Sequence, residues 1–256
     1  MAKIYSITNQ KGGVGKTTTS INLAVSLVAM KRKVLLIDLD PQGNATTGCG
    51  VDKNGIELSV YDLLVQQTPA SEVICKSKSG IDVIPANSDL TAAEVELLDV
   101  KMKEMRLSYH LANIKDQYDY ILIDCPPSLN MLTVNALCAS DGVIIPMQCE
   151  YFALEGLADL IQTVQNISKV ANPKLEIEGV LRTMYDPRNS LTKDVSEQLM
   201  TYFPDKLYET VIPRNVRLAE APSHGLPVIQ YDKSSKGAMA YLALAGEILR
   251  RHKESK

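Results

Sequence analysis

The sequence predicts an α/β fold with a mostly parallel, twisted sheet covered by helices on both faces. Short apolar runs alternate along the chain with longer helical patterns, and most of these runs are continuously apolar, as in strands buried on both faces. The chain has no repeat, no low-complexity tract and no linker rich in Pro, Gly or Ser, which favours a single domain over residues 1–256. With 256 residues, 45% of them hydrophobic, it can bury a substantial core.

The predicted elements largely alternate between strand and helix. Expected strands are Lys3–Thr8, Val34–Asp38, Ile81–Pro85, Tyr120–Asp124, Gly142–Pro146 and Ile177–Thr183. Expected helices are Thr17–Met30, Ala92–Asn113, Met131–Ala139, Leu154–Val170, Leu191–Tyr202 and Lys236–His252. Because ligands of such sheets bind at the carboxyl ends of the strands, the loops that follow the strands are the expected site.

The composition of the chain bears on its cellular compartment and on the partners that it can bind. No apolar run reaches the ~18–20 residues that span a bilayer, and there is no signal-peptide core, so a cytoplasmic protein without membrane association is expected. The five cysteines include no C-x-x-C pair, which argues against a disulfide framework or zinc site and predicts reduced, mostly buried thiols. The net charge of -3 does not favour nucleic acid, but residues 182–256 hold 12 Lys and Arg against 9 Asp and Glu. A local basic face and an ordinary solvated surface both remain open there.

A glycine-rich loop follows the first predicted strand and opens the first predicted helix. This order is the context of a P-loop, in which backbone N–H groups and the helix N-terminus hold phosphates. The pattern assigns Lys16 to the β and γ phosphates and the Thr17 hydroxyl to magnesium. A nucleoside triphosphate with Mg²⁺ is the expected ligand, bound by Lys11, Gly12, Gly13, Val14, Gly15, Lys16, Thr17 and Thr18.

Carboxylates end two of the predicted strands. Asp38 and Asp40 stand two residues apart at the end of one strand, and Asp124 ends another. Behind a P-loop, an apolar strand that ends in one aspartate is the Walker B pattern, so Asp124 is expected to hold magnesium directly or through water. A strand-ending turn with an Asp cap would account for Asp38 but leaves Asp40 without a role.

The loop departs from the usual P-loop, because Gln10 replaces the first glycine and Lys11 adds a second lysine. The string KGGVGKT resembles that of the deviant-Walker P-loop ATPases. The resemblance implies that Lys11 crosses a dimer interface to the partner's nucleotide, as an arginine finger does in trans. It also implies that the segment DLDPQGN is a switch in which Asp40 positions the attacking water and ligates magnesium. Lys11, Lys16 and Asp40 are therefore the expected catalytic residues.

Three later segments narrow the resemblance to the ParA/Soj-type ATPases that partition bacterial chromosomes or plasmids. They are MQCEYFALEG at 147–156, LRTMYDPRN at 181–189 and IPRNVRLAEAPSHG at 212–225. The resemblance covers nearly the whole chain and implies ATP or ADP as ligand, with adenine contacts at Pro213 and Asn215 and a further nucleotide contact at Met184. It further implies a nucleoid-associated, ATP-driven sandwich homodimer that binds double-stranded DNA without sequence preference. A ParB-type centromere-binding protein is the implied partner that stimulates hydrolysis and release.

Arg188 and Arg217 match positions at which the resembled family binds DNA, and Arg214, Lys233 and Lys236 are lesser candidates. Contacts to backbone phosphates carry no sequence information, and a monomer offers few of them, so binding is expected to need the dimer. The alternative for each arginine is a solvated or salt-bridged surface residue.

Three other functions are weighed against partition. A MinD-like membrane-associated ATPase would end in a short amphipathic helix that meets lipid, whereas the final segment here has the pattern of a core-packing helix with a charged tail. A nitrogenase-type iron protein would need paired cluster cysteines, which the sequence lacks. A non-catalytic nucleotide-binding scaffold is opposed by the joint presence of Lys11, Asp40 and Asp124.

Overall fold

The structure is a computed structural model that describes residues 2–254. Its strands are β1 (Lys3–Ile7), β2 (Val34–Asp38), β3 (Cys75–Lys76), β4 (Asp82–Ile84), β5 (Tyr120–Asp124), β6 (Gly142–Gln148) and β7 (Glu176–Thr183). They form one sheet in the order β3-β4-β2-β5-β1-β6-β7, in which each neighbouring pair is parallel except β3 with β4. Every residue of β2 and β5 is buried, as expected for parallel strands covered on both faces.

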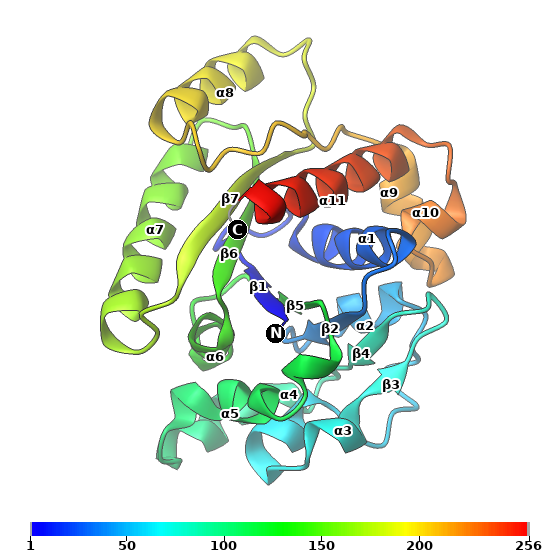
Figure 1. Cartoon of the computed structure of the whole chain (residues 1–256), viewed down its shortest axis with the longest axis vertical. Coiled ribbons are helices and arrows are strands. Elements are labelled where there is room, and N and C mark those ends of the chain that lie inside the picture. Colours follow the sequence, from blue (N-terminus) through cyan, green and yellow to red (C-terminus); the bar gives the residue numbers. More distant parts are fainter. Residues whose placement is uncertain (1, 255–256) are drawn as a thin grey trace.

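Helices cover both faces of the sheet. The α-helices are α1 (Lys16–Ala29), α2 (Asn44–Gly48), α3 (Ala70–Val73), α4 (Leu90–Glu96), α5 (Arg106–Ala112), α6 (Met131–Ala139), α7 (Ala153–Val170), α8 (Ser190–Tyr202), α9 (Val216–Glu220), α10 (Val228–Tyr231) and α11 (Lys236–Glu254). Shorter turns are η1 (Asp62–Gln66), η2 (Leu97–Asp99), η3 (Lys103–Met105), η4 (Lys115–Gln117) and η5 (Ala221–His224). In Figure 1, α1 and α11 lie side by side on one face, and α4 to α7 line the other. This architecture confirms the predicted fold class.

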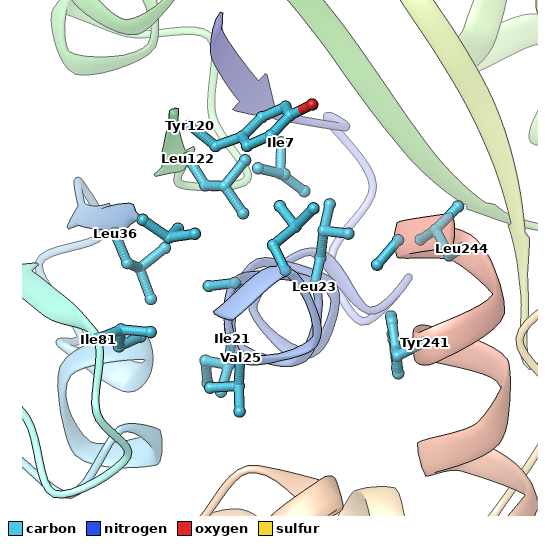
Figure 2. Close-up of a cluster of buried hydrophobic side chains, with 14 of the residues drawn as sticks. Ile7, Ile21, Leu23, Val25, Leu36, Ile81, Tyr120, Leu122, Tyr241 and Leu244 are labelled. Atoms are coloured by element: carbon cyan, nitrogen blue, oxygen red, sulfur yellow. The ribbon is translucent and has the colours of Figure 1, made fainter. Parts of the chain in front are cut away.

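The helix α1 is enclosed between the sheet and α11. Its Leu23 is fully buried within a cluster that includes Leu122 of β5 and Tyr241 of α11 (Figure 2). Burying a leucine side chain contributes about 1.5–3 kcal/mol. The Thr19 and Tyr241 hydroxyls add a buried hydrogen bond of 3.1 Å. The start of α1, and with it the glycine-rich loop, is therefore fixed by packing on two sides.

The C-terminal helix α11 contributes its apolar face to the same core, with Leu244 and Ile248 buried. Within residues 2–254, no helix is both long and apolar enough to cross a bilayer. All five cysteines are free thiols, four of them buried and Cys75 partly exposed, which confirms the prediction from composition.

The predicted strands and most predicted helices agree with the structure to within two residues at each end. The helix predicted over Ala92–Asn113 is wrong, because it breaks between α4 and α5. There Val100 is extended and Met102 adopts a left-handed conformation with φ 53°, neither of which an α-helix accepts. Asn135 of α6 stabilises the break, since its side chain accepts from the Leu107 N–H at 3.1 Å and donates to the Lys103 carbonyl at 2.8 Å. Tertiary hydrogen bonds therefore override the local helical pattern.

Packing around Gly179 on β7 predicts a sharp stability effect. A Cβ there would lie 2.4 Å from Tyr208 Cε2, and this ring cannot withdraw because the Arg251 guanidinium lies 4.5 Å from its centroid on α11. We expect Gly179→Ala to destabilise by about 1–3 kcal/mol and to lower Tm by roughly 2–10 °C. Gly156→Ala on α7 is the matched control, because its Cβ meets nothing within 4 Å and alanine favours a helix. Thermal unfolding in which both variants lose equal stability would contradict this packing.

Candidate nucleotide site

The loop of residues 9–18 connects β1 to α1 at the carboxyl edge of the sheet. Gly13 and Gly15 have φ of 73° and 88°, which glycine adopts at little cost. A Cβ built on Gly12 or Gly13 would meet nothing within 4 Å, so the mouth of the loop is open. An open run of glycine N–H groups at a helix N-terminus is suited to phosphate oxygens.

Two neighbouring strands hold the loop in place. The Asn9 side chain donates to the Pro146 carbonyl of β6 at 2.9 Å and accepts from the Lys11 N–H at 3.0 Å. The Thr183 hydroxyl at the end of β7 donates to the Val14 carbonyl at 2.8 Å. The start and the middle of the loop are thus anchored to the sheet.

The two lysines of the loop occupy different environments. Lys16 is buried, and its ammonium donates to the Lys11 carbonyl at 3.1 Å. Burial lowers the pKa of Lys16, while the Asp124 carboxylate acts in the opposite direction. Lys11 is exposed, and its ammonium forms an ion pair with Glu150, in the segment after β6. Lys16 therefore points into the loop, and Lys11 lies where a second molecule can reach it.

Asp124 ends β5 beneath the loop and is fully buried. Its Oδ1 accepts from the Ser20 hydroxyl of α1 at 2.7 Å, whereas Oδ2 has no hydrogen-bond partner among the described residues. Burial, and secondly the charge of Asp38, raise the pKa of Asp124, and the hydroxyls of Ser20 and Thr17 oppose this. An unpaired anionic oxygen close to the Thr17 hydroxyl suits a hard divalent cation such as Mg²⁺, which takes few protein ligands.

Asp38 and Asp40 are placed differently, although they stand two residues apart. Asp38 is fully buried, and its carboxylate accepts from the Thr46 N–H and hydroxyl at 2.8 and 2.7 Å and from the Asp40 N–H at 3.1 Å. It therefore folds the segment of residues 40–46 back onto β2. Asp40 is partly exposed, and among the described contacts its carboxylate accepts only from the Gln42 N–H, at 3.0 Å. The Asp38 carboxylate therefore stabilises the turn, whereas the Asp40 carboxylate lies partly exposed at the edge of the turn.

A cavity of about 200 Å³ opens beside the loop. Gly15 and Thr18 form one side of it, and Met184, Pro213 and Asn215 form the other. Three residues predicted to contact the nucleotide, which are distant in sequence from the loop, therefore lie next to the glycine-rich loop. The polar and apolar wall suits a flat, hydrogen-bonding ring such as a purine.

The predicted DNA contacts lie on the surface and are paired within the chain. The Arg188 guanidinium binds the Asp186 carboxylate in a bidentate contact of 2.9 and 2.8 Å. Arg217 is paired with Glu220 and Asp232. The lesser candidates Arg214, Lys233 and Lys236 are exposed on nearby segments. Two of the five cations thus already have carboxylate partners.

Three residues of this site received no role from the sequence. Glu150 pairs with Lys11, Thr183 holds the loop, and Ser20 binds Asp124. Thr183 ends a predicted strand at the same sheet edge as Asp38 and Asp124, and that position is a signal which could have identified it. Glu150 carries no such signal, because 139 residues separate it from Lys11.

Several known proteins are similar to this chain in sequence or in structure. Residues 2–177 match the family described as an AAA domain. The sporulation initiation inhibitor protein Soj of Bacillus subtilis is 55% identical over 249 residues, 97% of this chain and 98% of its own length. The chromosome partitioning protein ParA of Caulobacter vibrioides is 49% identical over 255 residues, 98% of this chain and 96% of its own length. Among solved structures, cobyrinic acid a,c-diamide synthase from Mycobacterium smegmatis, with bound ATP analog and magnesium, has a TM-score of 0.88 at 34% identity, covering 100% of this chain and 98% of that chain.

The buried carboxylate of Asp124 predicts a stability cost that depends on pH. The pKa of Asp124 is raised in the folded chain, so the folded state holds the carboxyl proton more tightly than the unfolded state does. The free energy of unfolding therefore falls as the pH rises above 3.8, the usual pKa of this carboxyl group. Asp124→Asn removes the charge at nearly constant shape. Without nucleotide and magnesium, we expect its Tm to exceed the wild-type Tm by at least about 2 °C at pH 8, with a smaller difference at pH 5. Thermal unfolding at both pH values tests this, and a difference independent of pH would contradict it.

Proposed function

This chain belongs to the ParA/Soj-type partition ATPases of the deviant-Walker P-loop family, and we propose that it hydrolyses ATP to segregate a chromosome or plasmid. The observation that carries the proposal is the convergence of Lys11, Lys16, Asp40 and Asp124 at the carboxyl edge of one sheet. A scaffold that only bound nucleotide would need the loop and Asp124. It would need neither an exposed Lys11 nor a partly exposed Asp40.

The proposed ligands are ATP or ADP with Mg²⁺. The loop from Lys11 to Thr18 would hold the phosphates, and the cavity lined by Met184, Pro213 and Asn215 would hold the adenine. Thr17, Asp40 and Asp124 offer oxygen ligands to the metal, which when bound neutralises phosphate charge. The unpaired Oδ2 of buried Asp124 supports this assignment.

In the proposed hydrolysis, Asp40 orients a water molecule in line with the γ-phosphoryl group. The water oxygen bonds to the γ phosphorus while the bond to the β–γ bridging oxygen breaks, and the products are ADP and phosphate. The Lys16 ammonium stabilises the charge that develops on the phosphate oxygens. Asp38 keeps Asp40 in place through the hydrogen bonds that fold residues 40–46.

We expect two chains to face each other across their nucleotides. Next to Glu150, the rings of Tyr151 and Phe152 are 75% and 70% exposed and contact each other edge to face. Exposed apolar rings beside the loop are typical of a surface that another protein chain covers. In that dimer, Lys11 exchanges Glu150 for the partner's γ phosphate and stabilises its charge in trans.

The proposed dimer binds double-stranded DNA through Arg188 and Arg217 of both chains, and a ParB-type protein stimulates hydrolysis and release. The net charge of one chain is -3, so a single chain makes few favourable contacts to DNA, and a dimer doubles the number of contacts to phosphates. We further propose that the chain acts as one domain, supported by its one continuous sheet, and that it works in the cytoplasm on the nucleoid.

The membrane-associated alternative has less support. The apolar face of α11 is occupied by the core through Tyr241, Leu244 and Ile248. A lipid-binding helix needs that face to be available.

Lys11→Ala tests catalysis in trans. The variant should bind ATP almost as well as the wild type but lose ATP turnover by at least about 100-fold, because the partner's phosphate loses its cation. Lys16→Ala should fail to bind ATP, since the helix dipole does not replace a full charge. Mixing the two variants pairs a nucleotide on the Lys11→Ala chain with an intact Lys11 on the other chain. A steady-state phosphate-release assay in which Lys11→Ala alone retains wild-type turnover would exclude a crossing lysine.

Arg217→Ala tests the DNA surface. With ATP present, we expect the slope of log affinity against log salt to fall by roughly one to two units per dimer, because each chain loses one phosphate contact worth ~0.9. Dimerisation should be unchanged. Fluorescence anisotropy with labelled duplexes at several salt concentrations measures the slope, and Arg188→Ala serves as a second probe. Wild-type affinity and slope in both variants would place DNA elsewhere.

A further inference from the structure

Arg217 is held by two carboxylates that belong to different parts of the fold. Its Nη1 donates to Glu220 Oε2 at 2.8 Å, and its Nε lies 3.3 Å from Asp232 Oδ2. Glu220 stands on the same helix, α9, whereas Asp232 follows α10. A guanidinium between two carboxylates carries one negative charge in excess, and such a cluster repels a phosphate.

The helix that carries Arg217 also forms a wall of the nucleotide cavity. Leu218 and Ala219 of α9 line that cavity together with Asn215. Asn215 caps α9, and its side-chain oxygen accepts from the Arg217 N–H at 3.1 Å. Because α9 has only five residues, a base that fills the cavity contacts the same rigid turn that positions Arg217.

Asp232 is anchored to the core rather than to α9. Its Oδ1 accepts from the Ser234 N–H and hydroxyl at 3.1 and 2.9 Å, and its own N–H donates to the Val228 carbonyl at 2.8 Å. The Val228 N–H in turn donates to the Asn22 side chain of buried α1 at 2.8 Å. A displacement of α9 therefore changes the contact between Arg217 and Asp232, whereas Glu220 stands on the same helix as Arg217 and moves with it, although it also accepts from the Tyr231 hydroxyl of α10 at 3.3 Å.

We propose that Asp232 is a positioning residue that makes phosphate binding by Arg217 depend on the bound nucleotide. Asp232 holds Arg217 when the cavity is empty, and a shift of α9 when a base fills the cavity releases the guanidinium to a DNA phosphate. Glu220 lowers DNA affinity equally in every nucleotide state. This inference rests on the proposed function, because DNA phosphates are the target of Arg217.

The test compares the DNA affinity of Asp232→Asn and Glu220→Gln without nucleotide and with a slowly hydrolysed ATP analogue and Mg²⁺. Asp232→Asn should tighten binding of a labelled duplex without nucleotide by roughly 2- to 5-fold per chain and leave the ATP-analogue value within about 2-fold of wild type. Glu220→Gln should tighten binding by the same factor in both states. Asp205→Asn, which removes an exposed charge elsewhere, is the matched control and should change neither value.

An Arg217→Ala background supplies the decisive control, because the effect of Asp232→Asn should vanish there. An equal gain from Asp232→Asn without nucleotide and with the analogue, no gain at all, or a gain that persists without Arg217 would overturn the role of Asp232. If the wild-type chain binds no DNA with the ATP analogue, the proposed function itself fails. If the wild type binds and Asp232→Asn behaves like it, only the present inference fails.

Discussion

The position of the glycine-rich loop depends on the burial of α1. The helix is enclosed between the sheet and α11, and its first residue, Lys16, already belongs to the loop. The side chains of Asn9 and Thr183 then fix the two sides of the loop to β6 and β7. The glycine-rich loop is thereby pre-organised, so that a ligand bound there would require little further ordering of the chain.

Two buried carboxylates meet at the same edge, and the structure treats them unequally. Asp38 is satisfied by Thr46 and by the backbone, so its burial is compensated by the turn that it builds. Asp124 keeps one oxygen unpaired. A buried anion without a partner destabilises the chain until a cation compensates it. The unpaired oxygen of Asp124 thus lowers the stability of the fold and is also the atom proposed to bind the metal. Such opposition between stability and function is common at functional sites.

Much of the fold and of the nucleotide site could be predicted, because local patterns determine both. The apolar runs that form β2 and β5 consist of consecutive residues and can be recognised without knowledge of their neighbours in the fold. The same holds for the order of strand, glycine-rich loop and helix. The break between α4 and α5 could not be predicted, since Asn135 on another helix stabilises it. Likewise, the pairing of Lys11 with Glu150 and of Arg217 with Asp232 depends on loops that only the folded sheet brings together. Sequence patterns therefore identify residue types at strand ends but not the ion pairs that restrain them.

We propose that ATP brings two loop faces together and that this dimer is the DNA-binding form. Sedimentation velocity of the wild-type chain with ADP, with ATP and with a slowly hydrolysed analogue, each with and without duplex DNA, tests it most directly. We expect a monomer with ADP, a dimer with the analogue, and co-sedimentation with DNA only when the dimer forms. A chain that stays monomeric with all three nucleotides, or that co-sediments with DNA equally well with ADP, would contradict it.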